Sequence, residues 1–73
     1  MMDGFADRLK ELIQDHNSNP YALEKAWGLG NGTLWNAVNR FKTPTIRVLI
    51  IIAENANVSL DWLVLGKGDK HGN

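Results

Sequence analysis

Apolar residues recur at helical spacing near the N-terminus of the chain. They lie at i, i+4, i+7 and i+8, and they are Phe5, Leu9, Leu12 and Ile13. Because this spacing places them on one face, the sequence predicts an amphipathic helix over residues 4–16. Asp3 is the expected N-cap, since its short side chain can accept a hydrogen bond from a free backbone N–H of the first turn.

Two short helices joined by a glycine turn are predicted next. Asn19 is a favourable N-cap, and Pro20 suits the first helical position, where its missing N–H costs nothing. Gly28 supplies the left-handed residue that ends this second helix. The third helix is expected to start near Gly30 or Asn31. The core-facing arc of this third helix contains Leu34, Ala37, Val38 and Phe41.

A fourth helix is predicted between the threonines that flank Pro44 and about Asn55. The β-branched run at 48–52 is also compatible with a strand, but helical spacing continues through it and the sequence offers no partner strand. The residues with helical spacing are Ile46, Leu49, Ile52, Ala53 and Ala56. A short fifth helix is expected from its cap at Ser59 through Leu65.

The sequence therefore predicts an all-α domain of five helices over residues 1–66, followed by a polar tail or the start of a linker at 67–73. A chain of 73 residues buries only roughly 60% of the surface that it exposes when unfolded, so a large catalytic cleft is not expected. The longest apolar run, at 48–53, is too short to span a membrane, and the N-terminus lacks a signal pattern. A cytoplasmic protein without a membrane partner is expected.

Candidate chemistry is sparse in this sequence. Without cysteine, the chain has neither a disulfide framework nor a thiolate metal site. His16 and His71 have no neighbouring groups for metal binding or catalysis. No set of side chains supplies a nucleophile, a base and an oxyanion donor, so we expect no enzyme activity, metal, cofactor or small-molecule ligand.

The net charge of the chain is zero, but the charges are unevenly distributed. Residues 1–24 carry a net charge of −3 and residues 54–73 a net charge of −1. The window 25–53 has no acidic residue and four basic ones, which are Lys25, Arg40, Lys42 and Arg47. An anionic partner is therefore expected to contact the middle of the chain.

The outward face of the third helix is rich in asparagine and glycine. With Leu34 pointing inward, Gly32, Asn36 and Asn39 point outward, flanked by Trp35 and Arg40. Asparagine is a poor helix former, so its use on this short helix indicates a compensating role. An Asn amide can pair with adenine in the major groove, and a glycine near the helix start allows close approach.

The second helix has a matching role in this interpretation. The N-terminus of a helix carries free N–H groups and a partial positive charge, which suits a DNA phosphate near Asn19, Pro20 and Tyr21. Two short helices joined by a tight turn, with the second in the major groove, have helix-turn-helix geometry.

Two stretches carry a resemblance to a known family. NPYALEKAWGLGNGTLWNAVNRFKTP, residues 19–44, resembles the helix-turn-helix of the phage repressor and Cro-type family. TPTIRVLIIIAENANVSLDWLVLGKGD, residues 43–69, is similar to the fourth and fifth helices of prophage CI-like repressors. Together they cover nearly the whole chain, and they imply a lambda-repressor-like five-helix DNA-binding domain that represses transcription by occluding a promoter.

The resemblance also implies roles for individual residues. The expected base contacts lie at about 31–40, in the recognition helix, and are Asn31, Gly32, Trp35, Asn36 and Asn39. The expected phosphate contacts are Asn19, Tyr21, Lys25, Thr33, Arg40 and Lys42. Pro20 replaces a glutamine that contacts phosphate in many relatives. Glu24 replaces a small residue, and its carboxylate is expected to fill the space beside Ala37 and meet a donor on the third helix.

Several interpretations stay open at this stage. Trp35 either contacts DNA or lies against its own domain, whereas Trp27 and Trp62 are expected in the core. Excess apolar surface and the family resemblance both predict a homodimer on operator DNA, with Ile51, Val64 and Leu65 at its interface. The alternative function is a protein-interaction module, such as an antitoxin or an adaptor, on the same helical scaffold.

Overall fold

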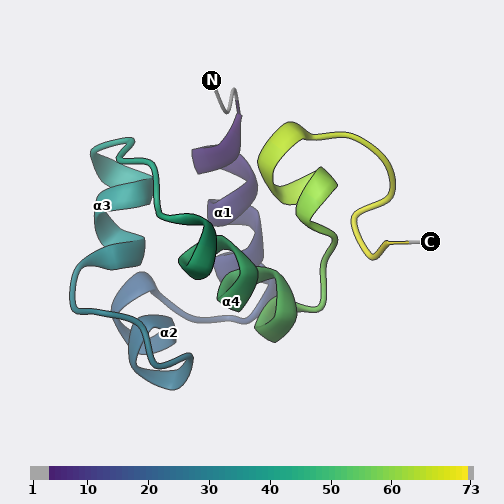
Figure 1. Ribbon diagram of the computed structural model, residues 1–73. Helices are drawn as coiled ribbons and strands as arrows, with labels where there is room; N and C mark the ends of the chain where they lie inside the picture. The colour runs from purple at the N-terminus through teal and green to yellow at the C-terminus, as the bar shows by residue number, and fades with distance from the viewer. Residues whose placement is uncertain (1–3, 73) are drawn as a thin grey trace.

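The computed structural model describes residues 4–72, and these form five helices without a strand (Figure 1). The helices in chain order are α1 (Phe5–Asp15), α2 (Pro20–Ala26), α3 (Thr33–Asn39), α4 (Ile46–Ala56) and η1 (Asp61–Leu65). Helix α1 is central and contacts both α3 and η1, while α2 packs against α3. The all-α, five-helix prediction is confirmed.

The core is built on the apolar face of α1. Phe5, Leu9, Leu12 and Ile13 are all buried, as their spacing predicts. They pack with buried residues of the other helices, including Leu23, Leu34, Leu49, Ile52 and Leu63. Gly4, with φ of 78°, is the N-cap of α1, and the expected cap Asp3 lies outside the described residues.

The caps of α2 are those that the sequence predicts. Asn19 Oδ1 accepts a hydrogen bond from the backbone N–H of Ala22 at 2.9 Å, and Pro20 occupies the first helical position. Gly28 is left-handed, with φ of 70°, and the N–H of Leu29 donates back to the carbonyl of Glu24. This bond closes the helix end and directs the chain into the turn before α3.

Helix α3 is shorter than the sequence predicts. It begins at Thr33 rather than near Gly30 or Asn31, because Gly32 is left-handed, with φ of 88°, and acts as its N-cap. It ends at Asn39, so Phe41 is not part of its core-facing arc and is 75% exposed. Phe41 has φ of 54°, and the N–H of the following Lys42 donates to the carbonyl of Asn36. The expectation that Phe41 is a core residue is wrong.

The β-branched run at 48–52 is helical rather than a strand, as its spacing predicts, and it lies within α4. Its buried residues are Leu49, Ile52, Ala53 and Ala56. Thr45 is the N-cap, and its hydroxyl oxygen accepts from the N–H of Val48 at 3.4 Å. Ile46 keeps the same helical spacing but is 65% exposed, because it is the first helical residue and the buried stripe begins one turn later, at Leu49.

The last helix, η1, is a single π-helical turn. The Ser59 hydroxyl oxygen accepts from the N–H of Trp62 at 3.0 Å, and Gly66 is the left-handed residue at the other end. The guanidinium of Arg8, on α1, donates to the carbonyls of Leu63 and Val64, each at 2.9 Å. These bonds satisfy carbonyl groups at the helix end and hold η1 against α1.

The segment after η1 returns to α1. Lys70 forms ion pairs with Glu11 and with Asp15, the latter at 2.6 Å, and lies 5.2 Å from the centre of the Trp62 ring. The hydrogen bonds to Asp15 and Glu11 raise the pKa of Lys70 above its ordinary value. Trp62 and Trp27 are both partly buried and pack against the core.

Candidate nucleic-acid interface

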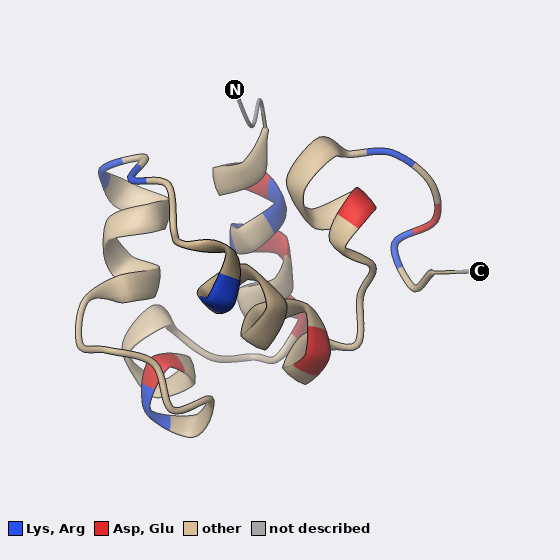
Figure 2. Cartoon of the chain, in the orientation of Figure 1, with Lys and Arg blue, Asp and Glu red and all other residues tan. Residues whose placement is uncertain are grey.

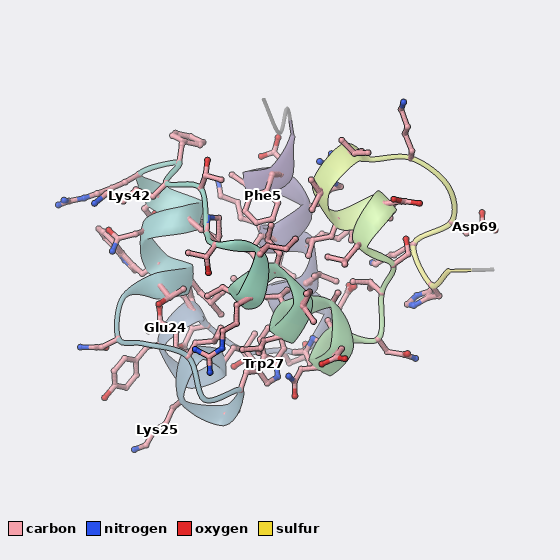
Figure 3. All side chains as sticks on the ribbon, in the orientation of Figure 1. Phe5, Glu24, Lys25, Trp27, Lys42 and Asp69 are labelled. Carbon is pink, nitrogen blue, oxygen red and sulfur yellow. The ribbon has the colours of Figure 1, made fainter. Side chains whose placement is uncertain are left out.

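A buried carboxylate joins α2 and α3. Glu24 is on α2, is only 3% exposed, and reaches toward the start of α3 (Figure 3). Its Oε1 accepts from the N–H of Gly32 at 2.9 Å. Its Oε2 accepts from the N–H of Leu34 at 2.7 Å and of Trp35 at 3.0 Å.

These three bonds provide acceptors for N–H groups of the first turn of α3. Such groups have no partner within the helix, and a negative charge near them is stabilised by the helix dipole. The expectation that Glu24 meets a donor on this helix is confirmed, and the donors are backbone N–H groups. The carboxylate therefore fixes the position of α3 relative to α2.

The face of α3 away from the core contains the predicted base contacts. Asn31, Trp35 and Asn39 are exposed, while Gly32 and Asn36 are partly exposed. The buried residues of the helix are Leu34, Ala37 and Val38, so its polar and apolar residues are separated. The structure thus places Asn36 and Asn39 on the accessible side of α3, and Asn31 in the exposed turn just before it.

The amides of the two helical asparagines differ in their partners. Asn39 Nδ2 donates to the backbone carbonyl of Trp35 at 3.0 Å. The Asn36 side chain has no hydrogen bond to any described residue, and its Nδ2 lies over Gly32, 3.2 Å from where a Cβ would stand. Asn36 therefore keeps both its donor and its acceptor for a ligand.

Trp35 lies at the edge of this surface. The residue is 46% exposed, and the Arg40 guanidinium carbon is 5.5 Å from the centre of the Trp35 ring. One side of the ring borders a shallow hollow of about 290 Å³, whose lining residues are Lys10, Ile13, Gln14, Pro20, Trp35, Val38 and Asn39. The ring thus packs partly against its own domain while a large part stays accessible.

The hollow also reveals two polar residues that the sequence interpretation missed. Lys10 and Gln14 of α1 are exposed and lie beside Trp35 and Asn39. Their i, i+4 spacing puts them on one face of α1, which was the only available signal. Nothing in the sequence indicated that this face of α1 adjoins α3.

The candidate phosphate contacts are spread along the α2–α3 side of the molecule. Tyr21 is 66% exposed, and Lys25 and Lys42 extend away from the protein at two separate points of this side (Figure 3). Asn19 uses its Oδ1 to cap α2, so its amide nitrogen is the atom available to a phosphate. Thr33 is partly exposed and Arg40 is exposed beside Trp35.

Glu24 is the only acidic residue on α2 and α3. Its carboxylate is buried, where it accepts hydrogen bonds from backbone N–H groups of α3. Figure 2 shows basic positions on this side of the chain and most acidic positions on the other elements. Of the basic residues here, Lys25, Arg40 and Lys42 are exposed. An anionic ligand would therefore meet exposed basic residues there, with the nearest carboxylate covered.

The left-handed backbone at position 32 requires glycine, and this gives a prediction for the site. Gly32→Ala should lower the free energy of unfolding by about 1–2 kcal/mol, because φ of 88° is strained for a residue with a Cβ. The new Cβ would also displace the Asn36 amide. Thermal unfolding checks this result, with Gly30→Ala as the control, since Gly30 is not left-handed. Equal stability of Gly32→Ala and the wild type would contradict it.

The residues expected at a dimer interface lie on two elements. Ile51 is partly exposed on α4, whereas Val64 is partly exposed and Leu65 is 55% exposed on η1. Apolar side chains that are more exposed than these occur at Phe41 and Ile46.

Within residues 4–72, no group of three or more histidine, cysteine, aspartate or glutamate side chains could hold a metal ion. In the same part of the chain, every helix is too short or too polar to cross a membrane.

The arrangement of helices, the short turn before α3 and its exposed polar face together define a helix-turn-helix domain. Residues 7–71 match the family model of the bacteriophage CI repressor helix-turn-helix domain. The chain belongs to this family and is a DNA-binding regulator. Neither the curated proteins nor the solved structures gave a match.

Proposed function

We propose that the chain binds operator DNA sequence-specifically and represses transcription by occluding a promoter. Residues 31–40, which include α3, enter the major groove, where Asn31, Asn36 and Asn39 read base edges. The observation that carries this proposal is the Asn36 amide, which is accessible on an anchored helix and has no hydrogen bond to any described residue. Gly32 allows close approach of the backbone, and Trp35 contacts a sugar or a thymine methyl group.

Phosphate contacts fix the orientation of the domain on the duplex. Lys25, Arg40 and Lys42 supply charge, and Asn19, Tyr21 and Thr33 supply hydrogen-bond donors. These residues border the α2–α3 surface, so they contact the backbone on either side of the groove that α3 enters. Affinity should fall steeply with salt because bound phosphates release their counterions.

We propose that the domain binds its operator as a homodimer. A homodimer places two recognition helices about one DNA turn apart, and its operator is an inverted repeat. Such a protein acts within the cell on chromosomal or phage DNA, without a cofactor or a small-molecule ligand.

Selection from a pool of randomised DNA duplexes tests the function directly. We expect enrichment of an inverted repeat with half-site centres about 10 bp apart. The matched control is the Asn36→Ala/Asn39→Ala double variant, which should remain folded and lose the enrichment. Absence of enrichment by the folded wild type would overturn operator binding and favour the protein-interaction module, which the zero net charge also favours.

A further inference from the structure

The outward face of α4 carries a stripe that no described residue of the chain covers. It consists of Arg47, Ile50, Ile51 and Glu54, at i, i+3, i+4 and i+7. Arg47, Glu54 and Ile50 are exposed, Ile50 by 39%, and Ile51 is partly exposed. The opposite face of α4 supplies the buried core residues, so this stripe, which we call the α4 stripe, is separate from the core.

The charges of the α4 stripe lie at the unfavourable ends of their helix. Arg47 is in the first turn, near the positive end of the helix dipole, and Glu54 is in the last turn, near the negative end. Neither forms an ion pair with a described residue. Figure 2 shows α4 with a basic position at its start and an acidic one at its end. In the isolated protomer, both charges therefore oppose the dipole without a compensating partner.

A second copy of the chain can provide an ion-pair partner for both charges. We propose that two protomers associate through the α4 stripe, with their α4 helices antiparallel about a two-fold axis that passes between Ile50 and Ile51. Arg47 then lies opposite the partner subunit's Glu54, and Ile50 lies opposite the partner subunit's Ile51. Each charge also moves beside the end of the other helix that favours it.

The charge pattern selects a second copy over a different partner. The α4 stripe has a base at one end, an acid at the other and two isoleucines between, so it is complementary to itself when reversed. A surface of a single charge sign would leave either Arg47 or Glu54 opposite a like charge. This inference deepens the proposed homodimer and assigns its contact to α4, with Ile51 the only residue shared with the set expected from sequence.

Sedimentation equilibrium without DNA tests the inference separately from operator binding. Arg47→Glu and Glu54→Arg should each weaken self-association about tenfold or more, because each substitution puts like charges opposite one another at two symmetric positions. The double reversal Arg47→Glu/Glu54→Arg should return the dissociation constant to within about threefold of the wild-type value. Circular dichroism verifies folding, and all of these positions are exposed.

A matched pair of apolar variants tests the location of the contact. Ile50→Ser should dissociate the dimer. Leu65→Ser should leave it intact, and it is the matched control because Leu65 has the same size as isoleucine and is more exposed, on η1. The inference is overturned if the double reversal self-associates as weakly as the single variants, or if Leu65→Ser dissociates the dimer and Ile50→Ser does not. A wild type that is monomeric at millimolar concentration would also overturn it. Enrichment of single half-sites by such a monomer would leave DNA binding intact.

Discussion

Glu24→Ala should lower the free energy of unfolding by about 3 kcal/mol. The substitution removes an acceptor from three N–H groups, those of Gly32, Leu34 and Trp35. Bonds to a charged group contribute about 1.5–3 kcal/mol each but are not additive, and a buried N–H without an acceptor costs about 1–3 kcal/mol. Because the N-terminus of α3 also loses its tie to α2, DNA affinity should fall more than tenfold even at temperatures where the variant is folded. Denaturant unfolding and DNA titration measure the two effects.

Two comparison variants separate the Glu24 contacts from the loss of a carboxylate in general. Glu24→Gln keeps the shape and one good acceptor but turns an NH₂ group toward the N–H donors, so its stability should lie between those of Glu24→Ala and the wild type. Glu54→Ala removes an exposed carboxylate and should change the monomer stability by no more than about 0.5 kcal/mol. A Glu24→Ala protein as stable as the wild type would show that the three bonds contribute nothing.

Asn36→Ala should weaken binding to the selected operator by at least about 30-fold. A bidentate contact between an Asn amide and adenine contributes about 1–3 kcal/mol of discrimination, and a dimer makes the contact in both half-sites. Asn36 is the residue placed for this contact, because its amide has no hydrogen bond to any described residue and lies over Gly32. The variant should also lose the preference for adenine at one position of each half-site, measured by titrating operators substituted at that position.

Asn39→Ala is the matched comparison for this prediction. The Asn39 amide already donates to the carbonyl of Trp35, so only its Oδ1 is fully available to DNA, and its removal should weaken binding less. The stability of both variants should stay the same or rise slightly, since alanine is the better helix former. If Asn39→Ala weakened binding more than Asn36→Ala, the recognition face would be centred nearer the C-terminal end of α3.

Local signals in the sequence predicted most of the secondary structure. Asn19, Thr45 and Ser59 cap helices through their side chains as expected, and Gly28 and Gly66 end helices in the left-handed conformation. Caps depend on contacts within about four residues, which a sequence displays directly. The same holds for the apolar faces of α1 and α4, whose periodicity is local.

Errors occurred where a helix ended earlier than its apolar pattern. Helical periodicity put Phe41 on the core face of α3, but the helix ends at Asn39 and Phe41 becomes left-handed and exposed. Asparagine or glycine would have marked such an end, and phenylalanine does not. Ile46 shows a related effect: it keeps the helical spacing of α4 but is exposed, since the start of α4 extends past the part of the helix that the core covers.

The sequence by itself determined the five helices, the side-chain caps at Asn19, Thr45 and Ser59, the core stripe of α1 and the acid-free segment that contains the recognition helix. Each of these follows from residues that are close in the chain. The tertiary structure alone decided which N–H groups donate hydrogen bonds to Glu24, and that Arg8 holds η1 against α1. It also decided that Lys70 pairs with α1 and that Lys10 and Gln14 adjoin Trp35. Most of these contacts join residues far apart in the chain, and their partners depend on how the helices pack, which no local pattern encodes.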